Sequence, residues 1–159
     1  MAILKIVELG DEILRKKCKE VTEITPKIIT LLDDMKDTLI KANGVGLAAP
    51  QVGILRRIFI VDDGAGDGEH NIIEFINPKI IETKGHQVEV EGCLSLPGKY
   101  GVTSRPMTVT DEATDRNGKT FTYTGTGLYG RCLCHENDHL DGTLYIDNAL
   151  EMLDPEDFE

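Results

Sequence analysis

The sequence contains no tryptophan, only 5% aromatic residues and no long apolar run. No stretch approaches the ~20 apolar residues that a membrane-spanning helix requires, so a helical membrane protein is excluded. The N-terminal segment MAILKIVELGDEILRKK has a short apolar patch, early acidic residues and no small-residue cleavage site. It does not resemble a secretory signal, and a cytoplasmic location is therefore expected.

Basic residues are also scarce, because 17 lysines and arginines stand against 28 aspartates and glutamates, for a net charge of −11. A field of that sign repels nucleic-acid backbones and anionic lipid surfaces, so direct binding to either is not expected. The four cysteines are expected to be free thiols, as is usual for an intracellular chain of this size. They are Cys18, Cys93, Cys132 and Cys134.

What remains is the composition of an ordinary globular protein, with 40% hydrophobic and 28% charged residues. No internal repeat or low-complexity tract divides the 159 residues, so residues 1–159 are expected to form one domain. A monomer is the simplest expectation for its assembly.

The pattern of apolar residues predicts helices near both ends of the chain and strands between them. Helices are expected at 11–21, 26–41 and 127–140. Strands are expected at 57–62, 75–83, 87–90, 107–112, 120–124 and 144–146. The glycine-rich stretch 44–53 is expected to be irregular or a close-packed backbone segment, and Asn117-Gly118 marks a hairpin turn. Together these elements predict an α+β fold, with antiparallel β-sheets packed around the C-terminal helix.

That C-terminal helix carries HENDH (135–139), a case of the H-E-x-x-H pattern. His135 and His139 would lie on one helical face with their Cβ atoms roughly 5–6 Å apart, a spacing that suits two ligands of one metal ion. Glu136 stands beside them as a candidate proton carrier. A catalytic metal usually has three protein ligands, so a third one is needed.

The acidic residues that follow the motif are weak candidates for the third ligand. The metzincin pattern fails, because Tyr145 stands where that pattern requires a histidine. The tail looks too short and too acidic to fold back as a rigid helix. Its glutamates are Glu151, Glu156 and Glu159.

Cysteines are stronger candidates for the third ligand. Cys93 follows a glycine between two predicted strands, and a thiolate binds borderline metals well. Its rival is Cys132, which shares the helical face of the histidines. Three ligands stacked along one helix are poorly arranged for a tetrahedral site, so Cys93 is preferred and Cys132 is expected to be part of the wall.

Three segments together resemble the motifs of the peptide deformylases: GVGLAAPQ (44–51), EGCLS (91–95) and HENDH (135–139), in that family's order. The resemblance implies a hydrolase that removes the N-formyl group from the N-terminal formylmethionine of newly synthesised polypeptides and releases formate. It implies one divalent metal on Cys93, His135 and His139. The metal is typically iron(II), and zinc, nickel or cobalt can occupy the same site.

The resemblance also implies a mechanism and its residues. A metal-activated water attacks the formyl carbon, with Glu136 as general base and then general acid. The Gln51 amide and the Leu94 backbone N–H would stabilise the oxyanion, and Gly46 would align the substrate backbone. The methionine side chain would meet an apolar wall, for which plain core packing is the alternative. That wall would comprise Val45, Leu128 and Cys132.

Behind the ligands, Arg105 and Asp138 are expected to form an ion pair that Glu91 joins. His70 and His86 lie in polar stretches and are expected to be solvated, without a role. The sequence departs from the family pattern in two places, one of them a pair of residues. Cys134 replaces a usual glutamine, and Tyr129-Gly130 replaces the common leucine and alanine.

The expected partners are nascent formylmethionine polypeptides near the ribosome exit. Docking through a long basic C-terminal helix is not expected, since the chain ends in EMLDPEDFE. Two rival functions remain open at this point. One is a metallopeptidase that cleaves peptide bonds, and the other is an inactive, metal-binding relative.

Overall fold

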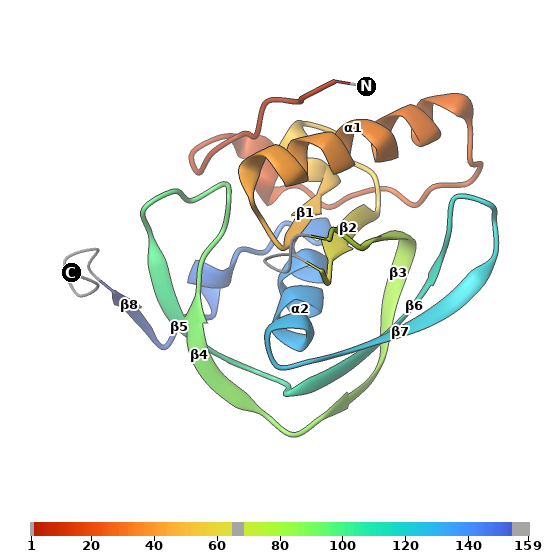
Figure 1. Ribbon diagram of the computed structural model, residues 1–159. Helices are drawn as coiled ribbons and strands as arrows, with labels where there is room; N and C mark the ends of the chain where they lie inside the picture. The colour runs from red at the N-terminus through yellow and green to blue at the C-terminus, as the bar shows by residue number, and fades with distance from the viewer. Residues whose placement is uncertain (1, 65–68, 154–159) are drawn as a thin grey trace.

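The computed structural model describes residues 2–64 and 69–153, which form two antiparallel sheets and two α-helices (Figure 1). One sheet has the strand order β1-β2-β3-β6-β7, and the other has the order β4-β5-β8. The helices are α1 (Pro26–Ala42) and α2 (Leu128–Leu140). The strands are β1 (Gly46–Ala48), β2 (Ile58–Asp62), β3 (Ile72–Lys84), β4 (Gln87–Glu91), β5 (Tyr100–Arg105), β6 (Thr108–Thr114), β7 (Thr120–Thr126) and β8 (Glu151–Leu153).

Helix α2 lies between the two sheets, whose strands curve around it, and α1 lies on the opposite side of β1 and β2 (Figure 1). The predicted α+β class, with antiparallel sheets around the C-terminal HExxH helix, is therefore confirmed. None of the helices in the described part of the chain is long and apolar enough to cross a bilayer.

Local sequence signals determine where α1 begins and ends. The Thr25 side chain caps its N-terminus by accepting a hydrogen bond from the Ile28 N–H, and Pro26 occupies the first turn. Asn43 ends the helix in the left-handed conformation, with φ of 57°. The helix packs an apolar stripe against the large sheet, and this packing supplies most of its stability. Its fully buried members include Leu32, Met35 and Leu39.

Strand β2 is buried on both faces, which explains its uninterrupted apolar sequence. Phe59 and Val61 belong to the core that α2 joins, whereas Ile58 and Ile60 belong to the core that α1 joins. The large sheet is thus a middle layer between the two helices.

Helix α2 is largely buried, and a glycine permits its close approach to the sheet. A Cβ on Gly130 would lie 2.6 Å from the Met107 carbonyl oxygen, so no larger residue fits there without movement. Glycine at this position brings the first turn of α2 close to the start of β6. The histidines and glutamate of HENDH consequently lie inside the protein rather than on its surface.

Several predicted elements need correction. The helix expected at 11–21 is only a 3-10 helix, η1 (Glu12–Arg15), because the chain then runs extended so that the Cys18 N–H can donate to the Leu140 carbonyl. The strand expected at 144–146 is also a 3-10 helix, η3 (Tyr145–Asp147). The stretch 44–53 is the close-packed backbone segment of the two alternatives, and it contains β1 and the 3-10 helix η2 (Ala49–Val52).

The remaining predicted elements are confirmed with shifts at their ends. These are the helices at 26–41 and 127–140, the strands at 57–62, 75–83, 87–90, 107–112 and 120–124, and the turn before β7. Strands β5 and β8 were not predicted. Both belong to the small sheet, which forms one side of the site described below.

Candidate metal centre

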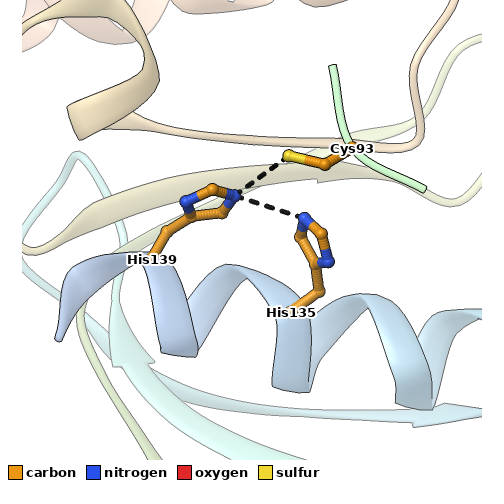
Figure 2. A group of neighbouring side chains, drawn as sticks. All are labelled: Cys93, His135 and His139. Atoms are coloured by element: carbon orange, nitrogen blue, oxygen red, sulfur yellow. Dashed lines mark hydrogen bonds between the residues drawn. The ribbon is translucent and has the colours of Figure 1, made fainter. Parts of the chain in front are cut away.

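Three side chains that are distant in sequence converge beside α2. Figure 2 shows His135 and His139 rising from adjacent turns of the helix, with Cys93 approaching from another segment. The His139 Nε2 lies 3.3 Å from the Cys93 Sγ and 3.2 Å from the His135 Nε2. The three candidate ligand atoms all lie within 4.8 Å of one another. The structure therefore brings together the three residues preferred as ligands from the sequence.

Cys93 owes its position to the turn between β4 and β5. Its carbonyl accepts a hydrogen bond from the Leu96 N–H at 3.0 Å, which tightens the turn. The buried Ser95 hydroxyl, two residues on, accepts a bond of 3.1 Å from the Gln51 Nε2. The turn that carries the thiol is thus fixed both by its own backbone and by η2.

The proton arrangement of His135 leaves a lone pair facing the centre. Its Nδ1 lies 2.5 Å from the Glu91 Oε2, so the ring donates its proton in that direction. The Nε2 of a neutral ring then has no proton and faces His139 and Cys93. Such an orienting carboxylate is typical of histidines that bind metals.

Glu91 is itself held by a buried network. Arg105 donates from Nε and Nη2 to its two oxygens, at 3.1 and 2.9 Å, and the Thr103 hydroxyl donates at 2.8 Å. The Arg105 Nη1 also donates to Asp138 at 2.7 Å. Burial acts to raise the pKa of Glu91, but the bonds from His135 and Arg105 outweigh it and lower the pKa to about 2. The ion pair expected behind the ligands is confirmed, together with Glu91 as its third member.

Glu136 has the opposite surroundings. It is buried, and no side chain or backbone group of the described residues pairs with its Oε1. Burial raises the pKa of this carboxyl to about 7, against a smaller lowering effect of His135. The carboxyl can therefore exchange a proton close to neutral pH, which is what a general base and acid must do.

Gly46 makes room for this carboxylate. A Cβ at Gly46 would lie 2.6 Å from the Glu136 Oε2 and 2.8 Å from the Cys132 Sγ. Any side chain there would displace one of them, so glycine is required for β1 to pass this close to α2.

Gln51 faces the same centre from η2. Its Oε1 accepts the Ala48 N–H at 2.9 Å, which orients the amide so that Nε2 points toward Ser95 and toward the Cys93 Sγ, 3.5 Å away. The amide is fully buried, and its donor end lies beside the candidate ligands.

A cavity of 590 Å³ opens beside the centre, a size suited to a short peptide segment. The residues expected from the sequence to act as ligands, base, oxyanion donors or substrate contacts all line it except His139, which is buried. The members other than the ligand candidates are Gln51, Leu94, Glu136, Gly46, Val45, Leu128 and Cys132. Sequence reasoning missed two cationic members of the lining, Lys99 and Arg131, because charged residues were sought only as ligands or bases.

The two rejected ligand candidates lie elsewhere. Cys132 borders the cavity but does not belong to the convergent ligand group, and burial raises the pKa of its thiol well above the ordinary value. Glu151 is an exposed residue of β8. Glu156 and Glu159 lie outside the described residues.

His70 is exposed, as expected from the sequence, but the prediction that it has no role is wrong, because it contacts a buried carboxylate. Its Nδ1 lies 2.6 Å from the Oδ2 of the buried Asp62. Burial acts to raise the pKa of Asp62, but the bond to His70 and the backbone N–H groups of Asn71 and Gly64 lower it overall. The Asp62 N–H donates to the Val45 carbonyl, so this pair supports the cavity wall from behind. No sequence signal links the partners of this contact.

The family departures are structural rather than part of the cavity. The Tyr129 hydroxyl donates to the Asp63 carbonyl and the Tyr123 hydroxyl to the Asp63 carboxylate, each at 3.0 Å, which fastens the end of β2 to α2 and β7. Cys134 is buried in the core and does not line the cavity. Burial raises the pKa of its thiol to about 11.

The donor set fits a divalent metal ion. Metal–nitrogen bonds of about 2.0–2.1 Å and a metal–sulfur bond of about 2.3 Å at tetrahedral angles place the donor atoms about 3.3–3.6 Å apart. The separations of 3.2 and 3.3 Å to the His139 Nε2 are close to this. Two imidazoles and a thiol suit iron, zinc, nickel or cobalt better than magnesium or calcium.

A buried H-E-x-x-H helix between antiparallel sheets, with a convergent thiol and an unpaired glutamate, defines a metal-dependent hydrolase. The family model for polypeptide deformylase matches residues 3–154, so the chain belongs to the polypeptide deformylase family. The peptide deformylase of Acetivibrio thermocellus is 50% identical over 159 residues, which are 100% of this chain and 91% of that protein.

Solved structures agree with this assignment. A peptide deformylase from Legionella pneumophila matches with a TM-score of 0.88 and 45% identity, over 92% of this chain and 86% of that one. The peptide deformylase from Thermotoga maritima matches with a TM-score of 0.86 and 35% identity, over 94% and 99%. The family resemblance of the three motifs is confirmed, and with it the implied activity, removal of the N-formyl group from nascent polypeptides.

Proposed function

We propose that Cys93, His135 and His139 hold one divalent metal ion at which this chain removes the formyl group from N-terminal formylmethionine, with formate as the second product. The convergence of these three donors beside the unpaired Glu136 carboxylate carries the proposal. Iron(II) is the expected physiological ion, and zinc, nickel or cobalt would use the same donors.

Glu136 moves the proton in the reaction. The metal, when bound, supplies the Lewis acidity that lowers the pKa of a water molecule at this site. Glu136 accepts the proton from that water as the formyl carbon is attacked, and then delivers it to the leaving amine. Its buried, unpaired oxygen supports this role, since no donor among the described residues occupies the Oε1 lone pairs that can accept the proton.

Gln51 and the Leu94 backbone stabilise the negative charge that develops on the formyl oxygen. The Gln51 amide is held in place by Ala48 and Ser95, so its donor end needs no reorganisation during the reaction. A preorganised donor of this kind contributes about 3–4 kcal/mol of transition-state stabilisation. Gly46 on β1 helps to align the substrate backbone, and its lack of a side chain leaves the Glu136 carboxylate in place beside it.

The methionine side chain of the substrate packs against the apolar part of the cavity. Val45 and Leu128 supply aliphatic surface, and Cys132 supplies a thiol that burial keeps protonated at neutral pH. A soft, uncharged wall suits a thioether, which would be poorly solvated by a charged one.

The substrates are nascent polypeptides, and the chain works where they are made, in the cytoplasm and close to the ribosome exit. Residues 1–159 act as one catalytic domain that contributes the donors, the base and the cavity, and the expected assembly is a monomer.

The test is formate release from an N-formyl-Met tripeptide by protein prepared without oxygen and loaded with iron(II) or nickel. Formate and free N-terminal amine should appear in equal amounts, with the peptide bonds intact. Peptide-bond cleavage would favour the metallopeptidase alternative. No formate from protein that holds one metal per chain would favour the inactive relative.

A further inference from the structure

The cavity contains two cationic side chains that the proposed chemistry does not use. Arg131 comes from α2, one turn before His135, and Lys99 comes from the β4–β5 turn that also carries Cys93. They therefore belong to two separate segments of the cavity lining. In a chain with a net charge of −11, two cations in one cavity are unexpected if their only purpose is solubility.

Arg131 is positioned but not neutralised. Gln87 donates from Nε2 to the carbonyls of Pro106 and Gly127, at 3.1 and 2.8 Å, which fixes the direction of its side-chain oxygen. Arg131 donates to that oxygen over 3.4 Å, a long bond to a neutral group. Among the described residues no carboxylate forms an ion pair with Arg131, so its charge remains available to a ligand.

Lys99, like Arg131, has no acidic partner among the described residues. Its backbone N–H donates to the Leu96 carbonyl at 3.2 Å, which holds the turn, while the side chain is exposed. Within residues 2–64 and 69–153 its ammonium group has no carboxylate within ion-pair distance.

The acidic residues of the cavity cannot neutralise these two cations. Only Glu91 and Glu136 line it among the described acidic residues, and both are buried. Glu91 is saturated by Arg105, Thr103 and His135, and Glu136 lies beside Gly46 at the candidate metal centre. The cavity lining thus carries two cations that no acidic residue of the described lining neutralises, with the apolar side chains of Val90 and Leu128 in the same lining.

We propose that Arg131 and Lys99 give this chain a preference for substrates with an acidic side chain at one of the two residues after formylmethionine. The inference rests on the proposed function, because it assigns the cavity to the peptide that follows the formyl group. A carboxylate in the cavity would gain Coulomb energy from both cations, whereas a lysine would be repelled. Because Lys99 is exposed, the preference should weaken as salt increases.

The test compares C-terminally amidated peptides, which have no terminal carboxylate to confuse the result. The series formyl-Met-Xaa-Ala-amide and formyl-Met-Ala-Xaa-amide, with Asp, Asn or Lys at Xaa, is assayed for kcat/KM by formate release. Wild-type protein should favour Asp over Asn by about three- to fivefold in one of the series, with Lys slowest. The ratio should approach 1 at high salt.

Variants locate the cause of the preference. Lys99→Gln and Arg131→Gln should each lower the Asp-to-Asn ratio to about half or less, whatever their rate with the Asn peptide. Arg131→Lys keeps the charge and should retain most of the ratio. Lys119→Gln removes the same charge from the β6–β7 turn, far from the cavity, and is the matched control.

Three results would overturn the inference: equal kcat/KM for the Asp and Asn peptides, a preference for Lys, or an unchanged ratio in both glutamine variants. Because the wild-type ratio is itself a test, an unstable Arg131→Gln protein does not prevent a decision. Formate release from none of the peptides would instead overturn the proposed function.

Discussion

Two buried carboxylates border the same histidine pair, and the regions that hold them differ. On the small-sheet side, Glu91 accepts hydrogen bonds from three side chains, and its pKa is lowered to about 2. On the β1 side, Glu136 has an unpaired oxygen, and burial raises its pKa to about 7. Both are glutamates with less than a tenth of their surface exposed.

The difference shows that burial alone does not decide what a carboxylate does. Where donors surround it, as at Glu91, the charge is permanent and can orient a histidine ring. Where donors are absent, as at Glu136, the group can gain or lose a proton near neutral pH. The site thus combines a carboxylate that stays charged, Glu91, with a carboxyl that can gain and lose a proton, Glu136, beside the same histidine pair.

The largest effect on activity should follow from replacing Glu136, the carboxyl that can gain and lose a proton near neutral pH. Glu136→Gln keeps the shape of the side chain but cannot accept a proton, so formate release should fall about 10²- to 10⁴-fold. Metal content, measured by elemental analysis, should stay at the wild-type level, because Glu136 is not one of the convergent donors. An active Glu136→Gln protein would show that the base is another group.

Removing Glu91, the carboxylate that stays charged, should instead weaken metal binding. Glu91→Ala frees the His135 Nδ1 and leaves Arg105 with only one carboxylate, so metal affinity should fall about 10- to 100-fold. The free energy of unfolding should also fall by about 3–5 kcal/mol, since a buried charge loses its partner. Metal titration and denaturant unfolding measure the two effects.

Glu89→Ala is the matched control for that change. Glu89 lies on the same strand, but it is exposed. Its removal should leave metal affinity and stability near wild type. Equal losses in both variants would mean that the small sheet, rather than the Glu91 contact, is the sensitive feature.

A third buried carboxylate, Asp111, shows the effect of burial on a carboxyl group that takes no part in the proposed reaction. Asp111 in β6 lies outside the cavity on the other side of α2, and its Oδ2 accepts a 2.9 Å bond from Asn137 while its Oδ1 is unpaired. Burial raises its pKa from 3.8 to about 6, against the lowering effect of that bond. The folded state therefore binds the proton more tightly than the unfolded state, so this group destabilises the fold above pH 6.

Asp111→Asn should consequently raise the free energy of unfolding by about 1–3 kcal/mol at pH 8. The gain should shrink as the pH falls through 6 and disappear near pH 4, where the wild-type carboxyl is protonated in both states. Glu112→Gln, an exposed neighbour, is the control and should show no such dependence. A constant gain at all pH values would contradict the assigned cause.

The smallest effect is expected at Cys134, although it immediately precedes His135. The thiol is buried in the core, outside the cavity. Cys134→Ala should lower the free energy of unfolding by about 1 kcal/mol and change kcat/KM for formate release less than about twofold. A large loss of activity with normal stability would place Cys134 in the reaction after all.

The sequence predicted the elements whose signals are local. Helix α1 has a capping threonine, an apolar stripe and a terminating asparagine within one segment, so the pattern is sufficient. The helical spacing of His135 and His139 likewise predicted their common face. The choice of Cys93 over Cys132 rested on the geometry that one helix can offer, and the structure places Cys93 beside both histidines.

Long-range contacts account for the rest. After Arg15 the chain leaves the helical conformation because Cys18 and Lys19 bond to α2 and to the segment before β2. Strand β5 buries glycine, threonine and arginine at alternate positions, and its buried polar side chains bond to Glu91 on β4 and to Asp138 on α2. The pairing of His70 with Asp62 depends on the fold of the intervening segment. None of these has a signal in the residues concerned.

The identity of the third ligand is the central claim, and X-ray absorption at the zinc edge of zinc-loaded protein tests it directly. One sulfur at about 2.3 Å and two nitrogens at about 2.0–2.1 Å are expected in the wild type. The sulfur signal should disappear in Cys93→Ser and persist in Cys132→Ser. A spectrum without sulfur, or one that loses it only in Cys132→Ser, would contradict the account.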